Sequence, residues 1–148
     1  MDQVIIYNVE ISENCPSGTC IEVPTGEITI EEVLERIDPK AVNVHIKNRD
    51  EILEDRYFRN AWSIKENNLV VDMGKAKDVH INKLREIRNK KLQSLDAEYM
   101  KALEIHDNDA VSKFVELKNK LRDMPIDSIF DLPLTPDELK NTVPEYLK

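Results

Sequence analysis

The sequence predicts an α+β protein, with a small ββαβ-type N-terminal unit followed by a long antiparallel helical hairpin and a short C-terminal helix. Short β-rich segments separated by turn residues fill the first half of the chain. A long stretch without proline then carries apolar residues at helical spacing. With only 3 glycines among 148 residues, the chain is poorly supplied for the many tight turns of an all-β fold. We expect three parts, covering residues 1–72, 73–123 and 124–148.

Two strands open the chain. Residues 4–9 are rich in β-branched side chains, and residues 20–23 alternate as a returning strand. The segment between Cys15 and Cys20 has the composition of a turn. The two cysteines either form a disulfide across this turn or stay as free thiols, and a reducing cytosol favours free thiols.

A short helix and a third strand follow. Thr29 and Glu32 have the spacing of a capping box, which predicts a helix that runs to about Ile37. Pro39 cannot continue that helix. The next segment alternates apolar and polar residues and predicts a half-buried strand, whose apolar positions are Val42, Val44 and Ile46.

Residues 55–62 concentrate aromatic side chains and include the only Trp of the chain. We expect a structural motif there, in which arginine stems pack against buried aromatic rings and the guanidinium groups pair with nearby carboxylates. Binding of an acidic ligand is the alternative. The motif residues are Arg56, Phe58, Arg59 and Trp62. A β-hairpin is predicted after them, over residues 63–71 with a turn at 66–68.

The second half of the chain predicts three helices. The first has Asp72 as its N-cap and runs without proline to about His106, a length of about 50 Å at 1.5 Å per residue. The second ends before Pro125 and carries Val111, Phe114, Leu117 and Leu121 on one face. The last is short and begins at Thr135, where a capping residue precedes proline at the first helical position.

The two long helices are unequal in length. The second covers about half of the first, so that residues 92–103 pack in the hairpin while residues 76–87 still present an apolar stripe. The candidate partner-binding residues on this stripe are Ala76, Val79, Leu84 and Ile87. Another chain, the N-terminal unit or the C-terminal segment could cover it. The apolar residues of that segment are Ile126, Ile129, Phe130, Leu132 and Leu139.

We find no sequence pattern for enzyme chemistry. No phosphate-binding glycine motif or nucleophile elbow occurs, and the three histidines are scattered. Two cysteines without clustered histidines do not complete a four-ligand zinc site. We therefore expect no catalytic residues, no metal and no cofactor. We also expect no membrane association, because the chain lacks a run of about 18 apolar residues.

A nucleic-acid-binding accessory protein is the alternative function. Residues 75–91 carry seven basic and two acidic side chains, which could neutralise phosphates. However, the whole chain has a formal charge of −8, and these cations do not fall on one narrow helical face. A solvated helix surface explains them more simply.

The segment Asp55-Arg56-Tyr57-Phe58-Arg59-Asn60-Ala61-Trp62 resembles a group of small tailed-bacteriophage proteins. The resemblance continues through Val71-Asp72-Met73, Leu84-Arg85 and Leu121-Arg122-Asp123 to Thr135-Pro136-Asp137-Glu138-Leu139, and it covers residues 55–141. Such proteins are encoded among virion and tail genes. The paired helices, proline-containing loop and final short helix are also similar to tail-fibre assembly proteins.

The resemblance implies a non-enzymatic tail-module protein, either a minor structural component of the virion or a chaperone for tail or tail-fibre assembly. Its partners would be other phage structural proteins or a second copy of itself. Its location would be the virion or the host cytoplasm. The resemblance brings no catalytic residues with it.

Overall fold

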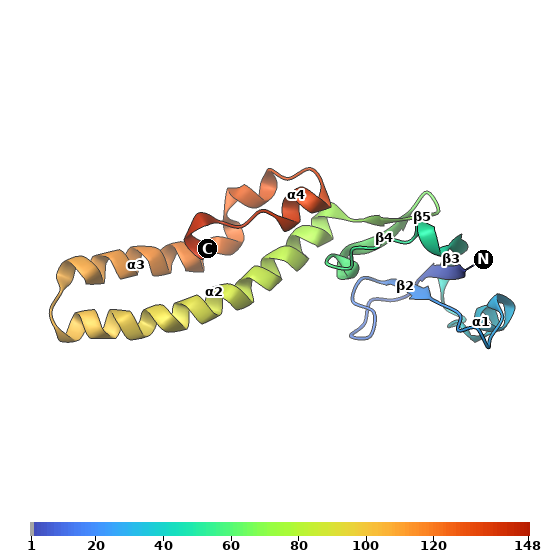
Figure 1. Ribbon diagram of the computed structural model, residues 1–148, viewed down its shortest axis with the longest axis horizontal. Coiled ribbons are helices and arrows are strands. Elements are labelled where there is room, and N and C mark those ends of the chain that lie inside the picture. Colours follow the sequence, from blue (N-terminus) through green and yellow to red (C-terminus); the bar gives the residue numbers. More distant parts are fainter. Residues whose placement is uncertain (1) are drawn as a thin grey trace. The chain divides into compact units, whose positions relative to one another are not determined.

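The computed structural model describes residues 2–148, which divide into two compact units, one ending at Ala76 and one starting at Lys77 (Figure 1). The first unit combines a sheet, a short helix and a β-hairpin, and the second is helical. The predicted α+β class, with its small sheet, long helical hairpin and short C-terminal helix, is therefore confirmed.

The first unit is built on a three-stranded antiparallel sheet with the order β2-β1-β3. Its strands are β1 (Gln3–Asn8), β2 (Thr19–Glu22) and β3 (Val42–Asn48), and helix α1 (Ile30–Arg36) lies between β2 and β3 in sequence. The predicted capping box is present at the start of α1, because Thr29 and Glu32 each bond to the backbone N–H of the other. The ββαβ order of the N-terminal unit is thus confirmed.

A second, two-stranded sheet completes the core of this unit. Strands β4 (Trp62–Lys65) and β5 (Asn68–Val71) form the predicted hairpin, and its two turn residues, Glu66 and Asn67, both have positive φ. A two-residue turn of this kind has a twist that matches the twist of the flanking strands. Trp62 and Leu69 pack with Ile6 of β1 in one buried cluster. The hairpin therefore covers the face of the three-stranded sheet that carries Ile6.

Strand β3 presents its apolar residues to solvent, contrary to the sequence prediction. His45 pairs with Ile6 and Ile46 with Ile5, after a register shift in this ladder. His45 consequently points to the face covered by β4 and β5, and Val44 and Ile46 point to the other. Val44 is 39% exposed and Ile46 is 45% exposed. The alternation was predicted correctly, but its burial was predicted the wrong way round.

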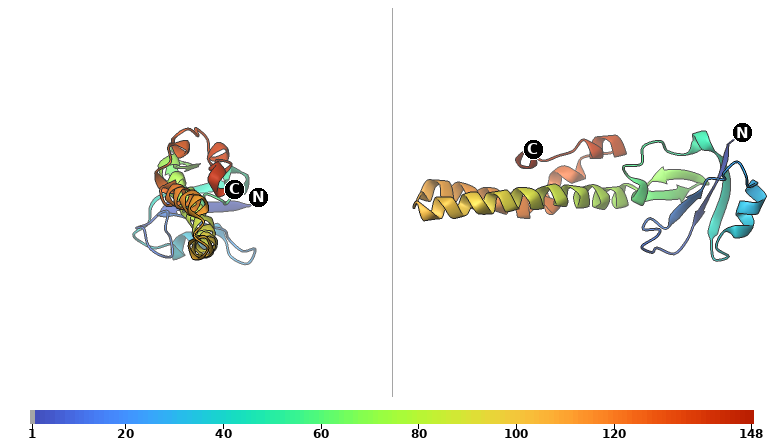
Figure 2. Two further views of the ribbon diagram at one scale, coloured as in Figure 1. Left: turned by 90° about the vertical axis from the view of Figure 1, so that its left-hand side faces the viewer. Right: turned by 60° about the horizontal axis from the view of Figure 1, so that its bottom comes forward.

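Helix α2 (Met73–Glu104) is a single unbroken helix of 32 residues, as the absence of proline predicted. Its N-cap is Asp72, whose Oδ1 accepts a hydrogen bond from the backbone N–H of Lys75 at 3.1 Å. Helix α3 (Asn108–Arg122) begins at the N-cap Asp107, and short α4 (Pro136–Lys140) begins at the N-cap Thr135. Figure 2 shows α3 alongside the C-terminal part of α2. No helix within residues 2–148 is long and apolar enough to cross a bilayer.

Candidate interaction surface

Helix α3 covers the C-terminal half of α2, as the helix lengths predicted. The ammonium group of Lys118 in α3 lies 2.5 Å from a carboxylate oxygen of Asp96 in α2. It also lies 4.7 Å from the centre of the Tyr99 ring, within the range of a cation–π contact. Ala102 in α2 and Leu121 in α3 are buried. The two helices are therefore joined along the hairpin by both polar and apolar contacts.

The C-terminal segment lies along the N-terminal part of α2 (Figure 1). Nε2 of His80 is 2.7 Å from the carbonyl oxygen of Thr142, and Lys77 pairs with the Asp131 carboxylate. Farther along α2, the Lys91 ammonium donates to the carbonyl oxygens of Tyr146 at 2.9 Å and of Lys148 at 3.0 Å. We call residues 124–148 the C-terminal strap.

The strap also supplies apolar side chains. Phe130, Leu139 and Leu147 are buried, and so are Ile81 and Leu84 of α2. The rings of His80 and Phe130 meet edge to face, with their centroids 6.0 Å apart. The sequence left three possible covers for this part of α2, and in the structure the C-terminal segment covers it.

The predicted partner-binding stripe is therefore wrong in part. Ala76 is buried, and Leu84 is only 4% exposed, so neither can meet a partner while the present packing is intact. Val79 is half-buried, whereas Ile87 is 51% exposed and remains accessible. The sequence left three possible covers for the stripe and could not choose between them, because the residues that cover it lie far along the chain.

Only some of the apolar side chains of the strap are buried. Phe130 and Leu139 are buried as expected, and Ile129 is half-buried. Ile126 and Leu132 are instead exposed, at 83% and 74%. The short 3₁₀ segments Met124–Ile126 and Ser128–Asp131 turn alternate side chains away from α2.

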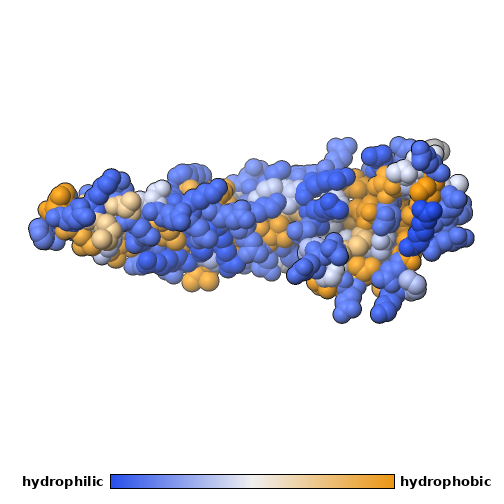
Figure 3. Space-filling view, turned by 90° about the horizontal axis from the view of Figure 1, so that it is seen from below, coloured by the Kyte–Doolittle hydropathy of each residue, from blue (hydrophilic) through white to orange (hydrophobic). Residues whose placement is uncertain are grey.

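Exposed apolar residues gather where α2 turns into α3 (Figure 3). We define the hairpin tip by four residues that sequence reasoning did not select: Met100, Leu103, Ile105 and Val115. Ile105 is 73% exposed and Met100 is 54% exposed, and the other two are also open to solvent. The available signal was that Met100 and Ile105 are apolar but lie outside the stripe that packs in the hairpin. Large apolar side chains grouped in the open indicate a contact surface.

The aromatic motif of residues 55–62 is buried only in its rings. Phe58 and Trp62 are buried, whereas Arg56 and Arg59 are exposed. Neither arginine has a carboxylate partner within 4.0 Å in the part of the chain that the structure describes, so the predicted local ion pairs are wrong. Asp55, the nearest acidic residue in sequence, instead accepts a hydrogen bond from the Tyr57 backbone N–H at 2.9 Å.

Cys15 and Cys20 are free thiols whose Sγ atoms lie 2.7 Å apart. Burial and the hydrogen bond with Cys15 raise the pKa of Cys20 from its ordinary value of 9.0 to about 12. Cys20 therefore stays protonated at neutral pH, where a thiol is a poor nucleophile.

At least five of the seven basic side chains in residues 75–91 bond to the protein's own acceptors, and two of these are Arg85, which donates to Asn82, and Arg88, which donates to Asn89. Lys75 donates to the carbonyl oxygen of Ser17 at 3.3 Å, Lys77 pairs with Asp131, and Lys91 holds the end of the strap. Fewer cations are thus available for phosphate than the sequence suggested.

Comparison of the chain with protein-family models, curated proteins and solved structures finds no match.

Proposed function

We propose that this chain is a non-enzymatic bacteriophage tail-module protein that works through protein–protein contacts made by its hairpin tip. It acts either as a minor structural component of the virion or as a chaperone for tail or tail-fibre assembly. The observation that carries this proposal is the exposure of Met100, Leu103 and Ile105 around the C-terminal end of α2 and of Val115 in α3. The phage context rests on the resemblance of residues 55–141.

The tip is suited to binding because its support is ordered before contact. The pairing of Lys118 with Asp96 and the packing of Ala102 hold the two helices together close to the turn. Little conformational entropy is then lost from the backbone when a partner binds. Full burial of one large apolar side chain contributes about 1.5–3 kcal/mol, so a few such residues are enough for a specific contact.

The partner that fits this tip is another structural protein of the phage tail with an apolar groove or helix face. Residues 98–116, which surround the tip, carry five acidic and two basic side chains, so an acidic polymer has little to bind there. A second copy of this chain would offer the same apolar surface. The experiment below therefore distinguishes self-association of the purified protein through the tip from binding to another tail protein.

Nucleic-acid binding is the weaker candidate. Lys75, Lys77 and Lys91 are bonded within the protein, and the formal charge of −8 repels a polyanion. Phosphate binding by the remaining basic residues would be lost between low and moderate salt. If the protein stayed bound to DNA at moderate salt, simple phosphate contacts by α2 would not explain the binding. Such binding would also argue against the proposed function.

The test compares purified phage particles with the lysate of infected cells by quantitative mass spectrometry. A virion component stays at constant stoichiometry in the particles, whereas a chaperone is found in the lysate together with tail intermediates. A chain found in neither tail intermediates nor particles contradicts the proposal. Analytical ultracentrifugation of the pure protein decides whether the tip instead binds a second copy.

The contribution of the tip is tested with Met100→Lys and Ile105→Lys combined. We expect the double variant to lose association with tail material and to keep its thermal stability, because both side chains are exposed. Gln93→Lys with Ser94→Lys is the matched control, since it adds the same charge at exposed positions of α2 away from the tip. Equal loss in both pairs would show a charge effect and contradict a role of the tip.

A further inference from the structure

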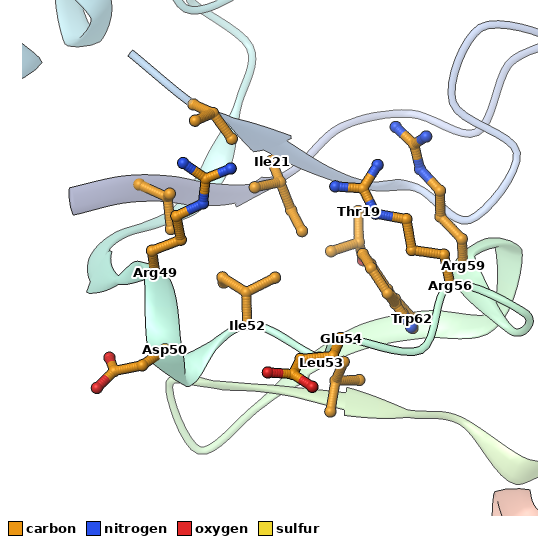
Figure 4. Close-up of a pocket in the computed structure, with 12 residues that line it drawn as sticks. Thr19, Ile21, Arg49, Asp50, Ile52, Leu53, Glu54, Arg56, Arg59 and Trp62 are labelled. Atoms are coloured by element: carbon orange, nitrogen blue, oxygen red, sulfur yellow. The ribbon is translucent and has the colours of Figure 1, made fainter. Parts of the chain in front are cut away.

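The first unit contains a cavity of about 610 Å³ that the proposed contacts of the hairpin do not involve. This volume falls in the range of about 300–1,000 Å³ that is typical of sites for small ligands. The cavity is bounded by β1, β2, the start of β4, and residues 49–59 that connect β3 to β4. Ile21, Ile52 and Trp62 give it apolar walls (Figure 4).

Charged groups are sorted around this cavity. In Figure 4 the guanidinium groups of Arg49, Arg56 and Arg59 lie along one side, and the carboxylates of Asp50 and Glu54 lie along the other. The residues up to Asp72 carry a net formal charge of −8, so a group of three arginines in this unit is unexpected. The separation of the two signs leaves a cationic side next to an apolar interior.

These guanidinium groups have few internal partners. Arg49 lies 3.8 Å from a carboxylate oxygen of Asp2, and both side chains are largely exposed, so this pair is weak. Arg56 and Arg59 form no ion pair within residues 2–148. Both guanidinium groups lie on the same side of the cavity in Figure 4, and the two residues are three apart on the same connection. An anion there would neutralise two like charges that otherwise repel each other.

Trp62 also carries a buried hydrogen-bond donor. Trp62 lines the cavity and is 3% exposed, and its indole Nε1–H has no hydrogen-bond partner among the residues that the structure describes. A buried donor without a partner costs about 1–3 kcal/mol unless water or a ligand satisfies it. The Nε1 atom is inaccessible, so this donor is a cost of packing Trp62 and not a contact for a ligand in the cavity.

We propose that this cavity binds a carboxylate that has an apolar body. The carboxylate group pairs with Arg56 and Arg59, whose planar guanidinium groups match its two oxygens. The apolar body lies against Ile21, Ile52 and the Trp62 ring. A single negative charge fits better than a doubly charged phosphate, because Asp50 and Glu54 offset two of the three arginines.

This ligand chemistry has two sources, namely a free organic acid and the C-terminal carboxylate of a peptide. Trp62 is the only tryptophan of the chain, so its fluorescence reports on the cavity alone. Octanoate is the probe for the first source. The acetylated tetrapeptide Ala-Ala-Leu-Leu with a free C-terminus is the probe for the second, and its C-terminal amide is the control. Saturable binding of either probe, but not of octanol or the amide, supports the proposal and identifies the source.

The site is tested by Arg56→Gln combined with Arg59→Gln. We expect the affinity for the bound carboxylate to fall about 10-fold or more, because charge-assisted hydrogen bonds are lost. Lys40→Gln with Lys65→Gln removes the same charge at exposed positions of the same unit outside the cavity, and should change affinity less than about 2-fold. Circular dichroism checks that both pairs fold. In the unmodified chain, 0.5 M salt should also weaken binding.

Three results would overturn the proposal. One is the absence of any saturable change in Trp62 fluorescence up to about 1 mM of either probe. Another is equal affinity in the arginine pair and the lysine pair. The third is tighter binding of octyl phosphate than of octanoate, which would contradict the preference for a single negative charge.

Discussion

His80 in α2 and Thr142 near the C-terminus are joined by a hydrogen bond of 2.7 Å, although 62 residues separate them in sequence. The carbonyl oxygen of Thr142 can only accept, so Nε2 of His80 carries the hydrogen and donates it. The imidazole is buried and also meets the Phe130 ring edge to face. One side chain of α2 therefore holds two separate points of the C-terminal strap.

Substitution of this histidine should loosen the strap. We expect His80→Ala to destabilise the helical unit by about 2–4 kcal/mol, because it removes a buried hydrogen bond and leaves a cavity beside Phe130. His106→Asn, at an exposed position with positive φ that asparagine tolerates, should be close to neutral. Urea unfolding and trypsin cleavage at Lys140 measure the two effects. Slow cleavage at Lys140 in His80→Ala would show that the strap does not depend on this contact.

Removal of the strap should expose the apolar stripe of α2. A chain ending at Asp123 uncovers Ile81 and Leu84, which are buried in the full chain. We expect the shortened chain to self-associate and Leu84→Lys to reduce that association, because a charge on the new interface opposes its burial. Light scattering after size-exclusion chromatography measures the mass. A monomeric shortened chain would mean that something other than the strap covers these residues.

Isoleucines in the central strand β1 and the edge strand β3 should respond differently to truncation. Ile6 is buried against Trp62 and Leu69, so Ile6→Ala should cost about 2–5 kcal/mol. Ile46→Ala, on the adjacent strand but with its side chain 45% exposed, should cost about 1 kcal/mol or less. Chemical unfolding of the two variants gives the comparison. A larger loss for Ile46→Ala would contradict the exposure of this side chain on the edge strand.

Alkaline pH should destabilise the first unit through the raised pKa values of Cys20 and Tyr7. Burial raises the pKa of Cys20 to about 12, and burial together with the Glu22 hydrogen bond raises the pKa of Tyr7 above its usual range. Both raised values favour the protonated folded state. The associated stability is complete below pH 9 and falls as pH rises toward 12, because the unfolded chain ionises first. Unfolding free energies measured between pH 8 and 11 should decline, and Cys20→Ser should reduce the slope.

Selective thiol labelling checks the same shift without unfolding the protein. At pH 8 an alkylating reagent should modify Cys20 much more slowly than a thiol of ordinary pKa 9.0, because only the thiolate reacts. Peptide mapping after short exposure identifies the modified residue. Fast modification of Cys20 in the folded chain would contradict its raised pKa, and labelling in denaturant controls for intrinsic reactivity.

Sequence reasoning succeeded where local signals decide the structure. The side chains of Thr29, Asp72 and Thr135 cap the helices that follow them, and each bond spans only three residues. The hairpin turn at Glu66 and Asn67 is equally local. Helix starts and turns were therefore predictable within a few residues.

Non-local contacts explain what was missed. Alternation along β3 gives two faces, but only the pairing of His45 with Ile6 determines which face meets the β4–β5 hairpin. The α2 stripe was recognised as needing cover, yet apolar burial has no direction and cannot distinguish a strap from a partner. The arginines of residues 55–62 were misread for a different reason: the neighbouring carboxylate of Asp55 accepts a hydrogen bond from the Tyr57 backbone N–H, and both guanidinium groups lie beside the cavity.

Site-specific photocrosslinking tests the proposed role of the hairpin tip most directly. A benzophenone side chain is placed at Ile105 in the tip or at Ile87 on α2, both of which are exposed. Crosslinking is carried out in infected cells, and the adducts are identified by mass spectrometry. We predict that position 105, but not position 87, crosslinks to a protein that is also found in purified phage tails. Crosslinking to a tail protein from position 87 alone would contradict docking through the tip.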